Sequence, residues 1–165
     1  MSASRISQTL HEEHQATIAF ATRLESLLAR QQRRLPDRAD PAVAMVLRSL
    51  PAVLDGELRR HFDFEEARLF SHLAAIGDAA IGEHLTSEHD AMRPLGARLV
   101  ALGGQALNDG FGDASWMEFR GAAAELCERL LAHVQKEEMV LLPLLNDALD
   151  PEADARLYDD YVGNA

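Results

Sequence analysis

The stretch His133-Val-Gln-Lys-Glu137-Glu138 is the most informative part of this sequence for the fold. It lies within residues 119–145, where apolar residues recur at alternating steps of three and four, the period of a helix face turned toward a core. His133 and Glu137 occupy positions at which that pattern calls for leucine. Burying an imidazole or a carboxylate is costly unless the group is paired, hydrogen-bonded or bound to a metal. The stretch therefore predicts a polar site inside a helical core. The apolar positions of the pattern are Phe119, Ala123, Leu126, Leu130, Leu141 and Leu144.

The same arrangement occurs 72 residues earlier, in His61-Phe-Asp-Phe-Glu65-Glu66, where it also interrupts a stripe of leucines. A shift of 75 residues relates two further segments, which carry Glu13-His14 and Glu88-His89. In both segments the histidine falls on a core-facing position of the apolar stripe. Each half of the chain thus pairs a Glu-His helix with a His-x-x-x-Glu-Glu helix. Two such helix pairs predict an all-α, up-down four-helix bundle.

The first expected helix begins between residues 4 and 9 and continues to about residue 32; the others cover about residues 41–76, 79–103 and 115–146, with a short acidic tail helix over about 151–162. Asp40-Pro41 and Asp150-Pro151 are helix starts, because aspartate caps the first turn and proline suits its first position. Pro51 lacks an N–H and should kink or interrupt the second helix. The pair Gly103-Gly104 is expected to begin a loop. The bundle then spans about residues 8–146 of a single domain, residues 1–165.

Composition narrows the classes of function. The chain has 165 residues, is 47% apolar and 26% charged, and so is globular. Its net charge of −11 disfavours a nucleic-acid partner, whose phosphates require a basic surface. No apolar run approaches the length of a membrane span, and the N-terminus lacks a signal-peptide core, so we expect a cytoplasmic protein that does not bind membranes. The single cysteine, Cys127, excludes an internal disulfide.

The polar positions suit a metal centre. Residues four apart on a helix are neighbours, so His61 with Glu65, and His133 with Glu137, can each offer a nitrogen and an oxygen to one metal region. The core-facing His14 and His89 add two more nitrogens. Such mixed ligands suit iron, manganese or zinc, and two carboxylates that can bridge indicate two metals. Without metal, we expect mutual repulsion to leave one of the two carboxylates protonated.

The complete pattern, with two Glu-His helices and two His-x-x-x-Glu-Glu helices in alternation, resembles the hemerythrin-like family, the HHE cation-binding domain. The likeness covers about residues 8–146. Members of that family are four-helix bundles that usually hold a non-haem di-iron centre. The resemblance implies two Fe ions with an oxo or hydroxo bridge, Mn or Zn being alternatives, and Glu65 and Glu137 as shared ligands. The metal-binding residues that it implies are His14, His61, Glu65, His89, His133 and Glu137.

Two positions depart from the oxygen-carrying hemerythrins. Those proteins place two histidines one turn apart on the third helix, whereas this chain has Leu85 at that turn and its nearest extra histidine at His84. Their last carboxylate also follows its histidine by five residues, which would select Glu138, whereas the apolar stripe selects Glu137. Glu66 and Glu138 lie one step off the stripe, where they can hydrogen-bond a ligand histidine or face solvent. Both departures disfavour reversible oxygen carriage.

We therefore expect a non-haem di-iron protein that binds or reacts with a small ligand, namely O2, H2O2 or NO. Four histidines and two glutamates undersaturate two octahedral irons and leave positions for such a ligand. The alternative is an iron-handling or regulatory module that uses the metal for storage, donation or sensing without catalytic turnover. The sequence does not decide between enzyme and non-enzyme, and it identifies no protein partner.

Overall fold

The computed structural model describes residues 4–163, and within that range the chain is helical with no strand. The first bundle helix is α1 (Arg5–Arg30). The second is a composite of α2 (Pro41–Leu50), η1 (Pro51–Leu58), α3 (Arg59–Phe64), η2 (Glu65–Leu69) and α4 (Phe70–Ala75), in which the η segments are π-helical. The third is α5 (Ala80–Asp109). The fourth comprises α6 (Asp113–Lys136), η3 (Glu137–Leu141) and α7 (Leu142–Ala148), and α8 (Pro151–Gly163) follows it.

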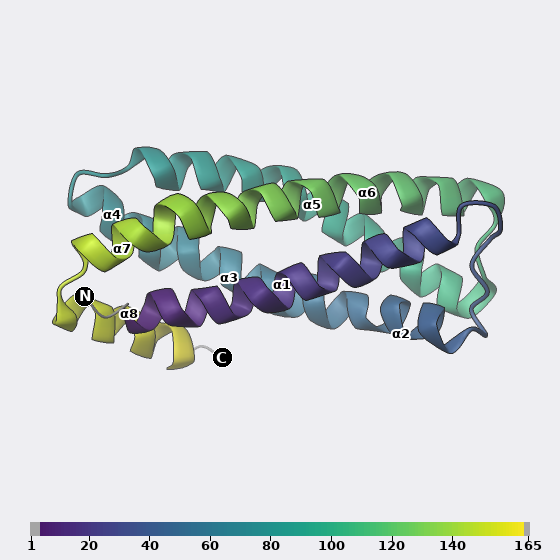
Figure 1. Cartoon of the computed structure of the whole chain (residues 1–165), viewed down its shortest axis with the longest axis horizontal. Helices are drawn as coiled ribbons and strands as arrows, with labels where there is room; N and C mark the ends of the chain where they lie inside the picture. The colour runs from purple at the N-terminus through teal and green to yellow at the C-terminus, as the bar shows by residue number, and fades with distance from the viewer. Residues whose placement is uncertain (1–3, 164–165) are drawn as a thin grey trace.

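The four long helices run alternately up and down the length of the molecule, and α8 folds back beside the N-terminal part of α1 (Figure 1). Around the bundle, α1 packs against α6, α6 against α5, and α5 against α2 and η1. This arrangement confirms the predicted all-α, hemerythrin-like bundle with a short C-terminal tail helix. No helix in residues 4–163 combines the length and the apolar character needed to cross a membrane.

Local sequence signals set most of the helix ends. The Asp40 carboxylate accepts the N–H of Ala42 at 2.9 Å, and Asp150 accepts that of Ala153 at 2.7 Å, as their positions before proline predict. The expected loop at Gly103-Gly104 is wrong, because α5 continues to Asp109. A Cβ on Gly103 would lie 2.6 Å from the Leu50 side chain, so this glycine permits close helix packing rather than ending a helix.

Pro51 does interrupt the second helix, since α2 ends before it and η1 begins there. The other two π segments follow the internal repeat: η2 begins at Glu65, and η3 begins 72 residues later, at Glu137. In each, the amide that follows the segment bonds to the glutamate carbonyl five residues back. A π turn inserts an extra residue into the helix and is frequent at functional sites. The repeat therefore extends to the backbone around both glutamates.

The hydrophobic core is divided into two clusters along the bundle. The larger one includes Phe20, Leu47, Phe119 and Leu126, and the smaller one includes Leu10, Leu73, Leu145 and Tyr161, the last of these from α8. His14 on α1 and His89 on α5 fall between the stretches that these helices contribute to each cluster. Apolar packing on both sides thus encloses the polar layer.

Candidate metal centre

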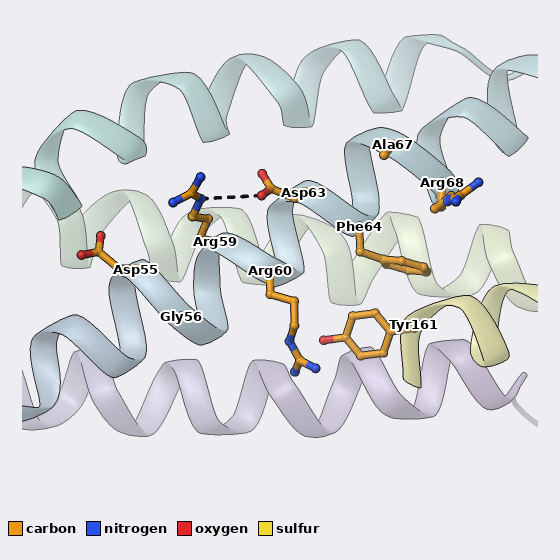
Figure 2. A pocket seen from close by; sticks show the side chains of 9 residues that line it. All are labelled: Asp55, Gly56, Arg59, Arg60, Asp63, Phe64, Ala67, Arg68 and Tyr161. Carbon is orange, nitrogen blue, oxygen red and sulfur yellow. Dashed lines mark ion pairs between the residues drawn. The ribbon is translucent and has the colours of Figure 1, made fainter. Parts of the chain in front are cut away.

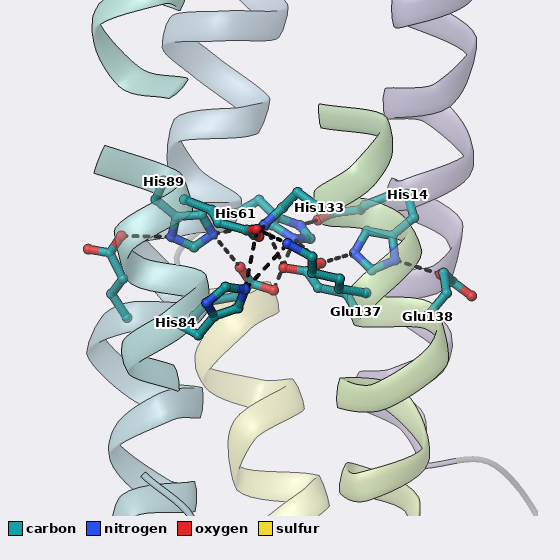
Figure 3. Close-up of polar contacts among 12 residues, drawn as sticks. His14, His61, His84, His89, His133, Glu137 and Glu138 are labelled. Atoms are coloured by element: carbon teal, nitrogen blue, oxygen red, sulfur yellow. Dashed lines mark hydrogen bonds and ion pairs between the residues drawn. The ribbon is translucent and has the colours of Figure 1, made fainter. Parts of the chain in front are cut away.

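Six histidine and glutamate side chains from all four bundle helices meet in this polar layer. All are at most 5% exposed. They form two groups of four whose ligand atoms all lie within 4.8 Å of one another, and both groups include Glu65 and Glu137. The first group adds His14 and His61, and the second adds His89 and His133. The structure thus brings together the six residues that the sequence analysis predicts as metal ligands, five of which, all but Glu65, are labelled in Figure 3.

Glu137 reaches both pairs of histidines. Its Oε2 lies 2.5 Å from Nε2 of His14 and 3.8 Å from Nε2 of His61, which belong to the first group. Its Oε1 lies 2.7 Å from Nε2 of His133, in the second group. One carboxylate therefore presents one oxygen to each group.

Glu65 repeats this arrangement from the opposite helix. Its Oε1 lies 3.1 Å from Nε2 of His61, and its Oε2 lies 3.2 Å from Nε2 of His89. The second group is closed by His89 and His133, whose Nε2 atoms are 3.1 Å apart. Two shared carboxylates and two imidazoles per group form a donor set that suits transition-metal ions.

Several atoms at the centre have no conventional partner. Within the described residues, Nε2 of His14 and both carboxylate oxygens of Glu65 and Glu137 are buried without a hydrogen bond of normal geometry. Imidazole nitrogens lie 2.5–3.1 Å from these oxygens, so nitrogen and oxygen ligand atoms crowd into one small space. Buried polar atoms in folded proteins almost always have a partner. The donor set therefore fits bound metal.

An outer ring of four glutamates holds the other nitrogen of each histidine. Nδ1 of His61 bonds to Glu13 at 2.7 Å, that of His89 to Glu66 at 2.7 Å, that of His133 to Glu88 at 2.8 Å and that of His14 to Glu138 at 2.6 Å. With Nδ1 donating to a carboxylate, the Nε2 lone pair of each ring faces the centre. Such contacts orient metal-binding histidines and raise their basicity.

The outer ring connects the helices in a cycle. Each of its glutamates is adjacent in sequence to an inner residue, but it holds a histidine on the next helix around the bundle. Thus Glu13 of α1 holds His61 on α3, and Glu138 of η3 holds His14 on α1. For Glu66 and Glu138 the sequence left open a hydrogen bond to a candidate ligand histidine or exposure to solvent, and the structure shows the hydrogen bond; for Glu13 and Glu88 it predicted no role. Their position directly before a core-facing histidine was the available signal.

A cationic or imidazole group contacts each outer glutamate from the surface. Arg60 lies 3.0 Å from Glu13, and Arg93 lies 3.0 Å from Glu66. His11 lies 2.9 Å from Glu138, and the ammonium group of Lys136 contacts Glu88. These contacts restrain the side chains of the outer glutamates, and the glutamates in turn restrain the orientation of the histidine rings.

The pKa values of the two inner glutamates differ from what the sequence led us to expect. Burial alone would raise the pKa of Glu137, but the nitrogens of His133, His14 and His61 hold that pKa well below its ordinary value. Burial and the charge of Glu137 act in the same way on Glu65, yet contacts with His61 and His89 lower its pKa as well. Both directions run against the expected uptake of a proton by one of the two carboxylates.

Two of the imidazoles show the opposite shift in pKa. Burial would lower the pKa of His61, but the charge of Glu65 and the contacts with Glu13 and Glu137 raise it well above the ordinary value. The pKa of His133 is raised against the same effect of burial, chiefly by Glu137. The opposite shifts of these imidazoles and of the two buried carboxylates have the same cause, their mutual contacts at the centre.

The structure separates the positions that the sequence left open. Glu137 is fully buried at the centre, whereas the Glu138 side chain is 28% exposed and lies in the outer ring. The His84 side chain is 54% exposed and lies 3.3 Å from Lys136, outside both groups of candidate ligands. His11 also lies outside them.

The family model described as the hemerythrin HHE cation binding domain matches residues 5–145, which cover the bundle helices up to Leu145 of α7 and include all six inner residues. No protein of curated function matches the chain.

Proposed function

Because this chain belongs to the hemerythrin HHE cation-binding family, we propose that its bundle holds two iron ions that share Glu65 and Glu137, and that this centre binds or reacts with a small ligand, O2, H2O2 or NO. His14 and His61 would complete the ligands of one ion, and His89 and His133 those of the other. Iron would supply one-electron redox chemistry and Lewis acidity at this position.

The observation that carries the proposal is the division of each carboxylate between the two histidine pairs. Glu137 directs Oε2 to one pair and Oε1 to the other, and Glu65 does the same. A site for a single ion would bring all of its ligands to one point. Two carboxylates that each span both pairs suit two neighbouring ions.

The surroundings of the centre select for a small reactant. Each group offers four protein ligands, so an octahedral ion keeps about two positions for water or an added ligand. The inner side chains are almost wholly buried between two apolar clusters, which excludes bulky substrates. The outer glutamates keep the imidazoles oriented while such a ligand binds.

The competing function is storage, donation or sensing of iron. A protein that donates iron must release it readily, and six buried side chains braced by an outer ring oppose rapid release. This favours a resident centre over an exchangeable one. The two functions differ in experiment, because only a reactive centre consumes or binds the small ligand while its iron stays in place.

Metal loading tests the dinuclear site first. Protein loaded anaerobically with Fe(II) and separated from free metal should hold about two irons per chain and develop near-ultraviolet charge-transfer absorption on exposure to air. One tightly bound ion per chain, without that absorption, would contradict a dinuclear centre. Parallel loading with Mn(II) and Zn(II) should show which metal binds most tightly.

Rapid-mixing spectra of the reduced protein with O2, H2O2 and NO test the reactivity. A spectral change that saturates at one ligand per centre, with iron content unchanged afterwards, supports small-ligand chemistry. Release of iron on mixing would favour iron handling instead.

A further inference from the structure

A cavity of about 290 Å³ lies between the second bundle helix and α5, and none of the six inner residues lines it. Most of its walls are aliphatic and aromatic side chains, which come from three of the four bundle helices. An apolar cavity offers water too few hydrogen-bond partners, but it can hold small apolar molecules. The wall residues are Leu54, Leu58, Phe62, Met92, Gly96, Ala97 and Leu126.

The inner end of this cavity, which we call the Phe62 cavity, adjoins the metal-binding layer. The Phe62 ring stacks on that of His89, with the ring centres 3.8 Å apart and the planes at 12°. It also meets the His133 ring edge-on, at 5.6 Å between centres. These two histidines are the imidazoles of one ligand group. The ring of Phe62 therefore stands between the cavity and that half of the centre.

The outer end of the Phe62 cavity carries its charged side chains. Asp55, Arg59 and Arg93 border the cavity. Asp63 pairs with Arg93 of α5 at 2.9 Å and with Arg59 at 3.8 Å, so one carboxylate links guanidinium groups on two helices. Figure 2 shows the Arg59–Asp63 pair on the opposite side of the second helix from Arg60. The side chains of Arg59 and Asp63 are 69% and 56% exposed, so this end lies at the surface.

A second cavity, of about 300 Å³, borders His61 and is called the His61 cavity here. Leu58 lines both cavities, which therefore flank the second helix. In the His61 cavity the ion pair stands at the metal end, because Glu13 bonds to His61 at 2.7 Å and Arg60 lies 3.0 Å from Glu13. In the Phe62 cavity the order is reversed, with charges at the surface and apolar walls at the metal end.

We propose that the Phe62 cavity binds an uncharged, weakly polar diatomic ligand, O2 or NO, and admits it to the centre on the side of His89 and His133. H2O2 would lose its hydrogen bonds with water against apolar walls, whereas O2 and NO have little to lose. The inference rests on the proposed function and deepens it, since it chooses among three small ligands. In the alternative, the Phe62 cavity is only a gap in the packing, and ligands enter beside His61.

Gly96 allows the Phe62 cavity to be filled without a change in any candidate ligand. A Cβ there would lie 3.8 Å from the Leu54 side chain, an ordinary contact, so Gly96→Ala keeps most of the cavity open and Gly96→Leu fills it. Gly104→Leu is the matched control on the same helix, because that position is exposed and a Cβ there meets nothing beyond its own stretch of helix within 4 Å. Thr17→Leu narrows the His61 cavity instead.

Xenon, an uncharged apolar atom, tests binding in the metal-free protein. Met92 lines the cavity and is 1% exposed, whereas Met45, Met117 and Met139 are at least 61% exposed and serve as internal references. Under rising xenon pressure, the methyl NMR signal of Met92 should shift to saturation in the wild type and in the control variants. The reference methyls should show no saturating shift, and Gly96→Leu should lose the shift at Met92.

Rapid mixing of the reduced, iron-loaded protein tests entry. Gly96→Leu should slow the reactions with O2 and NO at least about tenfold, the lower end of what one methylene changes in an apolar pocket. Its iron content and its reaction with H2O2 should match those of the wild type. Gly104→Leu and Thr17→Leu should react with O2 and NO as the wild type does.

Three outcomes would overturn the inference: no saturating xenon shift at Met92 in the wild type, unchanged or equally slowed reactions with all three ligands in Gly96→Leu, or slowing of O2 and NO by Thr17→Leu alone. If Gly96→Leu does not fold, Gly96→Val replaces it in both experiments. If the reduced wild type reacts with none of the three ligands, the proposed function fails, whereas the xenon shift still decides whether the Phe62 cavity binds an apolar ligand.

Discussion

Nδ1 of His14 lies 2.6 Å from a carboxylate oxygen of Glu138, which hydrogen-bonds this ring on the side that faces away from the centre. The adjacent residue, Glu137, lies 2.5 Å from Nε2 of the same ring. Two neighbouring glutamates on η3 therefore contact both nitrogens of one imidazole on another helix. The π turn that begins at Glu137 accompanies this division of roles, in which one carboxylate is a candidate ligand and the other orients the ring.

This division predicts different outcomes for two adjacent substitutions. Glu137→Ala should abolish the binding of both irons, because its carboxylate belongs to both ligand groups. Glu138→Ala should keep about two irons per chain but weaken their binding by roughly 10–100-fold, the usual effect of losing an orienting partner. Iron content after gel filtration and competition with a chelator would measure both effects.

Glu128→Ala on the exposed face of α6 is the matched control, and it should bind iron as the wild type does. Loss of iron in Glu138→Ala together with full retention in Glu137→Ala would reverse the assignment of inner and outer carboxylates.

The inner residues were predictable because helical periodicity is a local property. A histidine or glutamate that replaces leucine on an apolar stripe faces the core wherever the neighbouring helices lie. This reasoning identified His61, Glu65, His133 and Glu137 as core-facing, and the structure buries all four. The four-helix bundle was predictable for the same reason, because the apolar stripe of each helix must be covered by other helices.

The remaining features depend on which helix lies next to which. Glu13 precedes His14 in sequence but contacts His61 on another helix, and periodicity within α1 cannot show that. The loop predicted at Gly103 failed for a similar reason, since the close approach of Leu50 decides the role of that glycine. The π turns also escaped prediction, because they are insertions relative to the regular period on which such reasoning relies.

For His84, we expect that substitution has little effect on the metal. Its imidazole lies 3.3 Å from Lys136 and 3.4 Å from Glu88, outside both ligand groups. His84→Ala should therefore retain about two irons and an unchanged oxidised absorption spectrum, whereas His89→Ala should change both. A spectral shift in His84→Ala comparable to that in His89→Ala would show that His84 is a fifth histidine ligand.

The stability of the apo protein should depend on pH through its buried histidines. The pKa values of His61 and His133 are raised in the folded state above an ordinary value near 6.5. Folded protein thus binds these protons more tightly than unfolded protein, so their stabilising effect is complete below about pH 6.5 and is lost as pH rises through the folded-state values. The apo melting temperature should fall between about pH 6 and pH 8.

Iron-loaded protein should behave differently, because metal binding requires deprotonated Nε2 atoms and strengthens as pH rises. The difference in melting temperature between loaded and apo protein should therefore widen from about pH 6 to pH 8. A constant difference across this range would mean that protons and metal do not compete for these histidines.

Metal should also stabilise the fold at neutral pH. Without it, the carboxylates of Glu65 and Glu137 lie buried with no hydrogen bond of normal geometry in the described residues, at a cost of roughly 1–3 kcal/mol for each unsatisfied group. Metal that binds only the native state adds about 2.7 kcal/mol at a free concentration 100 times its Kd. For a chain of this size, that corresponds to a rise of roughly 5–10 °C in melting temperature.

Scanning calorimetry of apo and Fe(II)-loaded wild type should show this rise, and Glu128→Ala should show it equally. Glu137→Ala, which lacks a ligand common to both groups, should lose most of it. If apo and loaded wild type melted at the same temperature while iron stayed bound, the metal would bind folded and unfolded chains alike, and these six side chains would not form a buried site specific to the folded bundle.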